Sequence, residues 1–226
     1  MTINKVSRTP AGQQIPMIMS EMQTAAETLQ EIGWGVSVFG SARIKPDNPY
    51  YAVTEALGAR LAQAGLPVIA GGGPGIMEAV NKGAFEAGGR SIGLNIKLPR
   101  ETTNNRYQTH SLHFDYFASR KATFFMHSAA YIVLPGGFGT MDELFEVLTL
   151  VQTHKVPPAP IILVGAAYWT GLIDWMQSQM LPNGLIGPND LKLLTISDDL
   201  DVIMHEIEAF YTEHADQLSY VAAMPE

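Results

Sequence analysis

The sequence of 226 residues contains no cysteine and few charged residues. Without cysteine the chain can form no disulfide, no thiolate nucleophile and no cysteine-ligated metal site. Charged residues make up 16% of the chain, and the acidic ones outnumber the basic ones to give a net charge of −8. A surface that follows a nucleic-acid backbone needs a stripe of Lys and Arg. We therefore expect no nucleic-acid partner.

Long hydrophobic runs are also missing. No apolar stretch approaches the roughly 20 residues that a membrane helix needs, so we expect no membrane partner. The N-terminus lacks the apolar core of a signal peptide, which makes the cytoplasm the expected location. Residues 1–14 are polar and include Pro10 and Gly12, which is typical of a flexible arm. We expect residues 15–226 to form a single catalytic domain, because the chain as a whole is 46% hydrophobic and of ordinary domain length.

The six histidines do not form a metal-binding pattern. His110 and His113 are three residues apart, but they lie in a segment expected to be extended, where they would point to opposite sides. We therefore expect no metal site.

Short apolar runs alternate with helical patterns along most of the chain. The runs occur at 36–39, 66–70, 91–96, 131–134, 161–164 and 193–196, and helical spacing occurs near 22–32 and at 50–64, 75–87, 115–129, 140–153, 168–180 and 199–213. This alternation predicts an α/β fold, a Rossmann-like doubly wound parallel sheet with helices on both faces. Neither G-x-G-x-x-G in the first turn nor a Walker motif is present, so we expect neither NAD nor a triphosphate site.

One glycine-rich turn, in residues 134–143, joins an apolar run to an amphipathic helical pattern. Gly136, Gly137 and Gly139 would let the backbone approach a ligand, and the free N–H groups of a first helical turn suit a phosphate. Thr140 would add a hydroxyl to this phosphate site. The alternative is that Thr140 and Glu143 form only a capping box, but that leaves the three glycines unexplained.

A second glycine cluster, residues 71–75, repeats this layout. Gly72, Gly73 and Gly75 either approach the ribose or phosphate of the same ligand or form a tight strand-to-helix turn, and the sequence leaves both interpretations open. Met77 could form a wall against a base, although a methionine on a helix is more often part of the core.

Two charged residues are the candidates for catalysis. The carboxylate of Glu143 could orient or deprotonate a water that attacks an oxocarbenium-like sugar. Arg120 shares a helical stripe with Phe117 and Phe124 that should be buried, so its charge needs a partner: Glu143, a substrate phosphate or a structural acid. Lys121 faces about 100° away and is expected on the surface. Weaker candidates are Arg43, Glu78, Asn95, Arg106 and Glu146.

Together, the two glycine motifs and the Ser119-Arg120-Lys121 segment resemble the LOG family, the cytokinin-activating nucleoside 5′-monophosphate phosphoribohydrolases often labelled "lysine decarboxylase". The resemblance runs from about residue 36 to about residue 203. It implies hydrolysis of AMP or an N6-substituted AMP to free base and ribose 5-phosphate without a cofactor. It also implies a catalytic Glu143, a catalytic and substrate-positioning Arg120, and a nucleotide pocket lined near Gly40 and Ser41.

The resemblance further implies a homodimer, or a multiple of it, with the active site near the subunit interface. A helix carrying Phe114, Phe117, Phe124 and Phe125 on several faces agrees with this expectation.

Two other functions remain open. A non-catalytic nucleotide or molybdenum-cofactor carrier could use similar glycine turns, because fold does not determine function. A lysine decarboxylase dependent on pyridoxal phosphate would need a Schiff-base lysine at a phosphate site, and only Lys121 lies near a motif.

Overall fold

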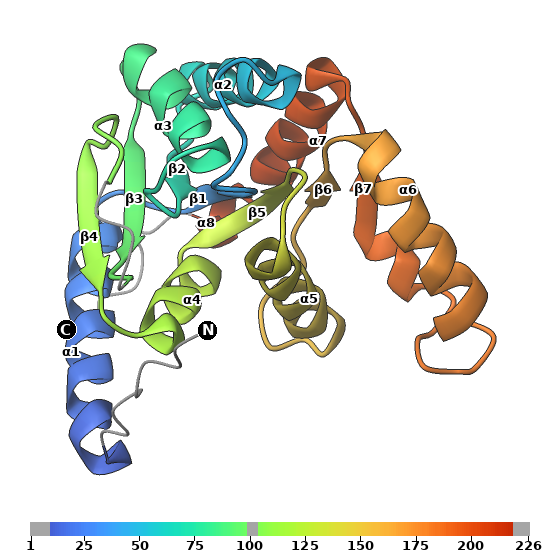
Figure 1. Ribbon diagram of the computed structural model, residues 1–226, viewed down its shortest axis with the longest axis horizontal. Helices are drawn as coiled ribbons and strands as arrows, with labels where there is room; N and C mark the ends of the chain where they lie inside the picture. Colours follow the sequence, from blue (N-terminus) through green and yellow to red (C-terminus); the bar gives the residue numbers. More distant parts are fainter. Residues whose placement is uncertain (1–9, 99–103, 219–226) are drawn as a thin grey trace, which may run out of the picture.

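The computed structural model describes residues 10–98 and 104–218. Its centre is a sheet of seven parallel strands in the order β4-β3-β2-β1-β5-β6-β7 (Figure 1). This architecture confirms the predicted Rossmann-like doubly wound fold. The strands are β1 (Gly35–Phe39), β2 (Val68–Ala70), β3 (Ser91–Ile96), β4 (His110–Phe114), β5 (Ser128–Val133), β6 (Ile161–Leu163) and β7 (Leu194–Ile196).

Helices cover both faces of this sheet. The first group, α2 (Pro49–Gln63), α3 (Ile76–Glu86) and α7 (Leu200–Glu213), packs on one face, and the second, α1 (Ala11–Gln30), α4 (Phe117–Met126), α5 (Phe138–Gln152) and α6 (Ala166–Trp175), packs on the other (Figure 1). A π-helical turn, Met176–Met180, a 3₁₀ turn, Asp190–Leu193, and the short α8 (Ala215–Leu218) complete the elements. In the described part of the chain, no helix has the length and apolar character to cross a membrane.

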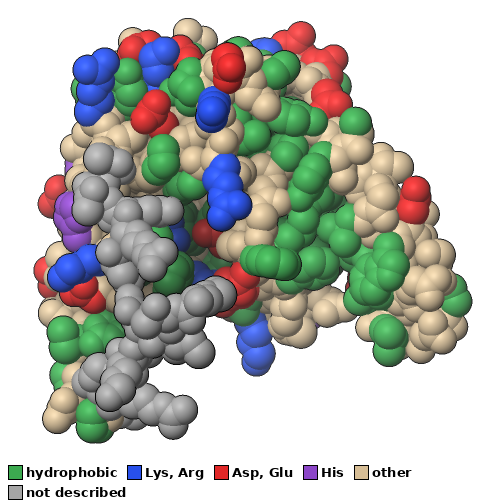
Figure 2. All heavy atoms as spheres, viewed as in Figure 1, with side chains coloured by type: hydrophobic (Ala, Val, Ile, Leu, Met, Phe, Trp, Pro, Cys, Tyr) green, Lys and Arg blue, Asp and Glu red, His purple; other side chains and the backbone are tan. Residues whose placement is uncertain are grey.

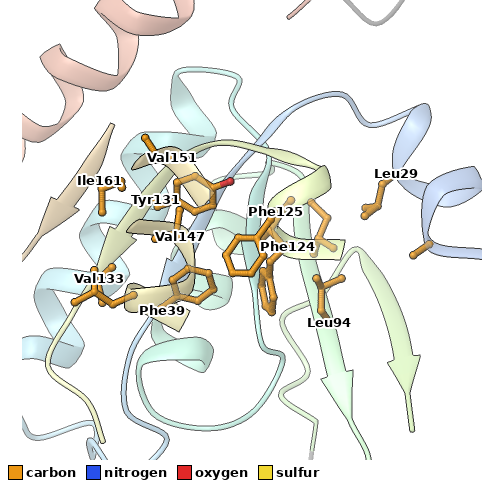
Figure 3. Packing of buried hydrophobic residues seen from close by; sticks show 14 of the residues in the cluster. Leu29, Phe39, Leu94, Phe124, Phe125, Tyr131, Val133, Val147, Val151 and Ile161 are labelled. Carbon is orange, nitrogen blue, oxygen red and sulfur yellow. The ribbon is translucent and has the colours of Figure 1, made fainter. Parts of the chain in front are cut away.

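Each strand sends alternate side chains to the two faces, as its pleat requires. Val36 and Val38 of β1 pack under the first group of helices, whereas Phe39 packs under the second. Figure 3 shows Phe39 beside Phe124 and Tyr131, with the ring centroids of Phe39 and Phe124 5.1 Å apart. Because both faces are covered, the central strands are buried along their whole length, which explains their unbroken apolar runs.

The start of α1 and the presence of strand β4 differ from the sequence-based expectation. Helix α1 already begins at Ala11, so residues 11–14 of the expected arm are helical. These residues have no apolar periodicity to reveal the helix, and residues 1–9 lie outside the described ranges. Strand β4 was expected only as an extended segment around His110 and His113, because the predicted strands were continuous apolar runs, whereas in β4 polar Ser111 and His113 alternate with buried Leu112 and Phe114.

The aromatic helix is therefore less apolar than expected. Phe114 belongs to β4, and α4 begins only at Phe117. Phe124 and Phe125 are buried, whereas Phe117 is 53% exposed.

The strand order reverses between β1 and β5. From β1 the chain continues through α2 to β2, on one side, and from β5 through α5 to β6, on the other. Helices α2 and α5 lie on opposite faces of the sheet. At such a switch point a crevice opens beyond the carboxyl ends of the two strands, where ligands of doubly wound sheets bind.

Candidate active site

A cleft of about 720 Å³ lies at this switch point. The predicted site residues that line it are Gly40, Ser41, Gly73, Met77, Arg120, Gly136, Gly137, Gly139, Thr140 and Glu143. The backbone N–H of Ser41 donates to the carbonyl of Pro135 at 3.1 Å and joins the turn after β1 to the turn after β5. Of the main candidates, Gly72 and Gly75 do not line the cleft.

The turn after β5 ends in an uncapped helix. Helix α5 has Gly137 as its N-cap, and no side chain among the described residues caps its first turn. Thr140 lies within that turn, so it does not form the capping box considered from the sequence. The N–H groups of Phe138, Gly139 and Thr140 have no intrahelical acceptor. These donors and the positive end of the helix dipole make this edge of the cleft suitable for an anion.

Tyr168 of α6 supports this turn from the side. Its hydroxyl donates to the carbonyl of Gly136 at 2.6 Å, and the residue also lines the cleft. Helix α6 is itself fixed by Asp198, whose carboxylate accepts hydrogen bonds from the N–H groups of Gly165 and Ala166.

In the second glycine cluster, Gly73 differs from its neighbours. Gly72 and Gly75 have φ angles of +74° and +70°, in the left-handed region that disfavours side chains. A Cβ on Gly72 would lie 2.0 Å from Oδ1 of Asn95, and one on Gly75 would lie 2.4 Å from the carbonyl oxygen of Ser41. These two glycines therefore shape a tight turn, and Gly73 faces the cleft.

Arg120 is a buried cation held largely by main-chain oxygens. Its Nε donates to the carbonyl of Leu94 at 2.7 Å, and its Nη2 donates to that of Gly71 at 3.3 Å. Its Nη1 lies 3.9 Å from Oε1 of Glu143. The helical stripe of Phe117, Arg120 and Phe124 was expected to be buried. This is confirmed for Phe124, over whose ring the guanidinium lies, and is wrong for Phe117. Burial lowers the pKa of Arg120, and the charge of Glu143 opposes that effect.

Glu143 is the acid of this pair, and its side chain is 15% exposed. Burial raises the pKa of its carboxyl to about 7, although the nearby positive charge of Arg120 acts in the opposite direction. A carboxyl with that pKa populates both protonation states near neutral pH. It can therefore take a proton from water and return it, as a general base and acid must.

Lys121 is not the surface residue that its helical angle predicted. Its side chain is 19% exposed and lies 2.7 Å from Asp142 and 2.5 Å from Glu146, measured between Nζ and a carboxylate oxygen. Burial lowers the pKa of Lys121, but these two carboxylates raise it above the ordinary value overall. An ammonium held in this way is a poor Schiff-base nucleophile, which argues against the decarboxylase chemistry.

The weaker candidates fall into two groups. Arg43 and Asn95 line the cleft. Arg106 is exposed and lies over the ring of Tyr107, and Glu78 accepts a hydrogen bond from Tyr51. Arg106 and Glu78 do not line the cleft, and neither does Glu146, which pairs with Lys121.

Several lining residues were not predicted from the sequence. They are mostly apolar, and include Ile96, Leu98, Phe117, Phe138 and Met141. Phe138 is 97% exposed, and its position inside the Gly-Gly-Phe-Gly turn was the one sequence signal available. Figure 2 shows hydrophobic side chains gathered on the face over α5 and α6, with basic and acidic side chains beside them. The cleft thus combines an apolar rim with a charged interior.

The histidines of β4 lie on opposite sides of the strand, as expected: His110 follows the partly buried side and His113 the exposed one. Among residues 10–98 and 104–218 there is no group of three or more side chains suited to hold a metal ion.

Relatives of known activity match most of the chain. The chain is 29% identical over 163 residues to cytokinin riboside 5′-monophosphate phosphoribohydrolase LOG1 of Arabidopsis thaliana, covering 70% of this chain and 75% of that protein. It is 28% identical over 199 residues to LOG4 of the same plant, a protein of the same named activity, covering 85% and 91%.

Solved structures match the fold. The X-ray structure of TM1055 superposes with a TM-score of 0.59 and 26% identity, covering 78% of this chain and 99% of that one. The molybdenum cofactor carrier protein of Chlamydomonas reinhardtii has a TM-score of 0.59 and 21% identity, covering 80% and 99%. At that identity the second match shows only a shared fold.

A family model described as "Possible lysine decarboxylase" matches residues 77–207, a segment that contains both Arg120 and Glu143. The chain therefore belongs to the LOG family, to which that model corresponds.

Proposed function

We propose that this protein hydrolyses the N-glycosidic bond of a purine nucleoside 5′-monophosphate, AMP or an N6-substituted AMP, to the free base and ribose 5-phosphate. The observation that carries this proposal is the pairing of Glu143 and Arg120, 3.9 Å apart and both largely buried, in one cleft with an uncapped helix N-terminus. The named activity of the plant relatives supports it.

Glu143 acts on water in the proposed reaction. Its carboxylate takes a proton from a water molecule as the water oxygen bonds to C1′ of the ribose and the bond from C1′ to the base nitrogen breaks. The proton that Glu143 took from water passes to the departing base, directly or through a second water molecule, so Glu143 is again ionised and water and nucleotide have become base and sugar phosphate. The negative charge of Glu143 also stabilises the positive charge that develops on C1′.

Arg120 and the turn after β5 bind and orient the substrate. The free N–H groups of the first turn of α5 suit the 5′-phosphate, and Thr140 and Ser41 offer hydroxyls in the same cleft. Arg120 carries a positive charge close to the reacting carboxylate and to the substrate. The binding energy of the phosphate then holds C1′ close to Glu143, and this positioning lowers the activation barrier for hydrolysis.

The apolar rim suits the base. Met77, Ile96 and Phe117 give the cleft an apolar side, which favours a flat aromatic ring over a second charged group. The cleft volume of about 720 Å³ leaves room for a substituent on the base.

We further propose that the protein works as a homodimer or a multiple of it. Large hydrophobic side chains lie exposed on the two packed helices α1 and α4, namely Ile15, Met19, Phe117 and Met126. A second subunit covering them would remove apolar surface from water. Sedimentation equilibrium should give at least twice the mass of one chain, and a fully active monomer at low concentration would contradict the proposal.

The alternative function is a non-catalytic carrier of a nucleotide or of molybdenum cofactor. Its support is the fold shared with the carrier of Chlamydomonas reinhardtii. A carrier needs a binding cleft but has no use for a buried carboxyl beside an arginine.

Chromatographic detection of adenine released from AMP separates the two functions. We expect release by the wild-type protein and almost none by Glu143→Gln, which keeps the shape of the side chain but removes its charge, while the Kd for AMP stays within about threefold. Glu78→Gln is the matched control, because Glu78 lies outside the cleft, and it should release adenine normally. Binding of AMP without adenine release by the wild-type protein would favour the carrier.

A further inference from the structure

Three amide side chains lie behind the turn of residues 71–73. We call Asn95, Asn105 and Gln108 the amide cluster. Asn105 donates from its Nδ2 to the carbonyl of Gly73 at 3.0 Å and from its backbone N–H to that of Gly72 at 2.8 Å. Gln108 donates from Nε2 to the carbonyl of Gly72 at 3.1 Å, and its Oε1 accepts from Nδ2 of Asn95 at 3.0 Å. The cluster thus holds two successive carbonyls of the turn.

Two glycines make room for these amides. A Cβ on Gly72 would lie 2.0 Å from Oδ1 of Asn95, and a Cβ on Gly93 would lie 2.1 Å from Oε1 of Gln108. Both contacts are far shorter than any side chain tolerates. The amides therefore fit against bare backbone, which couples their positions closely to β3 and to the turn.

The same two backbone segments hold Arg120. Its Nη2 donates to the carbonyl of Gly71, next to Gly72, and its Nε donates to that of Leu94, next to Asn95. Asn95 is fixed in turn by its hydrogen bonds to Ser111 and to the carbonyl of Leu112. The distance of 3.9 Å to Glu143 is too long for a hydrogen bond. Main-chain carbonyls, rather than the carboxylate, therefore set the orientation of the guanidinium.

We propose that the amide cluster is a set of positioning residues, which fixes the carbonyls of Gly71 and Leu94 and through them aims the guanidinium of Arg120 into the cleft. This inference rests on the proposed hydrolase function. Asn105 and Gln108 do not line the cleft, so they act through Arg120. Their side chains matter because the backbone at Gly72 is left-handed and these amides donate hydrogen bonds to the carbonyls of Gly72 and Gly73.

Gln108→Met tests the proposal, because methionine has a similar length and removes every donor and acceptor of the amide. We expect kcat for AMP to fall by about ten- to a hundredfold, the scale of a misplaced catalytic group, while KM changes less than about threefold. Ser37→Ala is the matched control. It breaks a buried hydrogen bond of 2.6 Å to Ser128 away from the cleft, so it should lower the melting temperature but leave kcat unchanged.

A double-mutant cycle shows whether the effect passes through Arg120. In the Arg120→Ala background, Gln108→Met should cause no further loss of kcat. Equal losses in both backgrounds would overturn the proposal, because the amide would then act by another route. If Gln108→Met does not fold, Gln108→Asn serves instead, since it keeps the amide but is one methylene too short to reach the turn.

A spectroscopic measurement separates failure of this proposal from failure of the proposed function. In the wild-type protein the buried Nε–H of Arg120 should give a slowly exchanging nitrogen-15 resonance, assigned by its absence in Arg120→Lys. Its exchange should be at least about tenfold faster in Gln108→Met and unchanged in Ser37→Ala. This result would support the positioning role even if AMP is not hydrolysed. An unchanged exchange rate in Gln108→Met would overturn the positioning role even if the protein hydrolyses AMP.

Discussion

Three glycines in the turn after β5 should respond differently to the addition of one methyl group. A Cβ on Gly136 would lie 2.1 Å from Oγ1 and 2.4 Å from Cβ of Thr140, whereas one on Gly137 or Gly139 would have no heavy atom within 4 Å. The first methyl would be forced into packed protein. The other two would enter the open cleft, where the proposed phosphate must approach the backbone.

These contacts set the expected magnitudes. Non-bonded carbon atoms pack at about 3.5–4 Å, so Gly136→Ala requires a shift of more than about 1 Å, and overpacking of this kind costs about 1–3 kcal/mol. In a protein of this size that cost lowers the melting temperature by about 2–12 °C. Gly137→Ala should leave stability nearly unchanged, and Gly139→Ala, inside α5, should gain up to about 1 kcal/mol from helix propensity.

Gly137→Ala and Gly139→Ala should both lose affinity for AMP although they keep or gain stability. If backbone N–H groups bind the phosphate, losing one charge-assisted hydrogen bond costs about 1.5–3 kcal/mol. The Kd for AMP in Gly137→Ala and Gly139→Ala should therefore rise at least about tenfold. Calorimetric titration and thermal melts measure the two quantities. Gly171→Ala is the control, since it adds a methyl in open space on α6, outside the cleft. Wild-type affinity in both cleft variants would refute the phosphate-site reasoning.

The remaining predictions concern pH and the phosphate. Because burial raises the pKa of Glu143 to about 7 and the base must be deprotonated, kcat/KM for AMP should rise about tenfold per pH unit below about 7 and level off above it; a flat profile from pH 5 to 8 would contradict the assignment. The raised pKa also means that the folded state binds more protons than the unfolded state between the ordinary value of 4.5 and about 7, so wild-type stability falls as pH rises through that window. The side chain of Glu143→Gln cannot titrate. Between pH 4.5 and 8, its free energy of unfolding, measured in thermal melts, should therefore rise by up to about 3 kcal/mol relative to that of the wild type. Adenosine should be at least about a hundredfold poorer than AMP in kcat/KM, since it lacks the phosphate that positions C1′, and similar rates would count against the role of the turn.

The sheet and the position of the cleft followed from local patterns. Apolar runs such as 131–134 had to be buried strands, and glycine turns after such runs had to meet at the carboxyl edge of a parallel sheet. The sequence left the approach of Arg120 to Glu143 as one of three possibilities; the structure brings the two together because Arg120 lies in the first turns of α4, after β4, and Glu143 lies in the first turns of α5, after β5.

Other features depend on tertiary contacts that local sequence does not encode. Gly73 faces the cleft and Gly72 does not, because of the left-handed backbone at Gly72 and the approach of Asn95. The helical angle of Lys121 was read correctly, but the sequence could not show that α5 brings Asp142 and Glu146 to it. Apolar lining residues such as Ile96 look like any other core residue until the cleft is seen.

The reversal of strand order has a consequence for folding cooperativity. Strands β4 to β1 come from the first half of the chain, strands β5 to β7 from the second, and they join along one ladder between β1 and β5. A molecule bound in the cleft would touch the turn after β1 and the turn after β5 at once. The bound molecule would therefore link the two halves of the sheet at the carboxyl end of the ladder between β1 and β5. Local unfolding of either half would then require the bound molecule to dissociate. Amide exchange in the strands on both sides of this ladder should then slow together when the cleft is occupied.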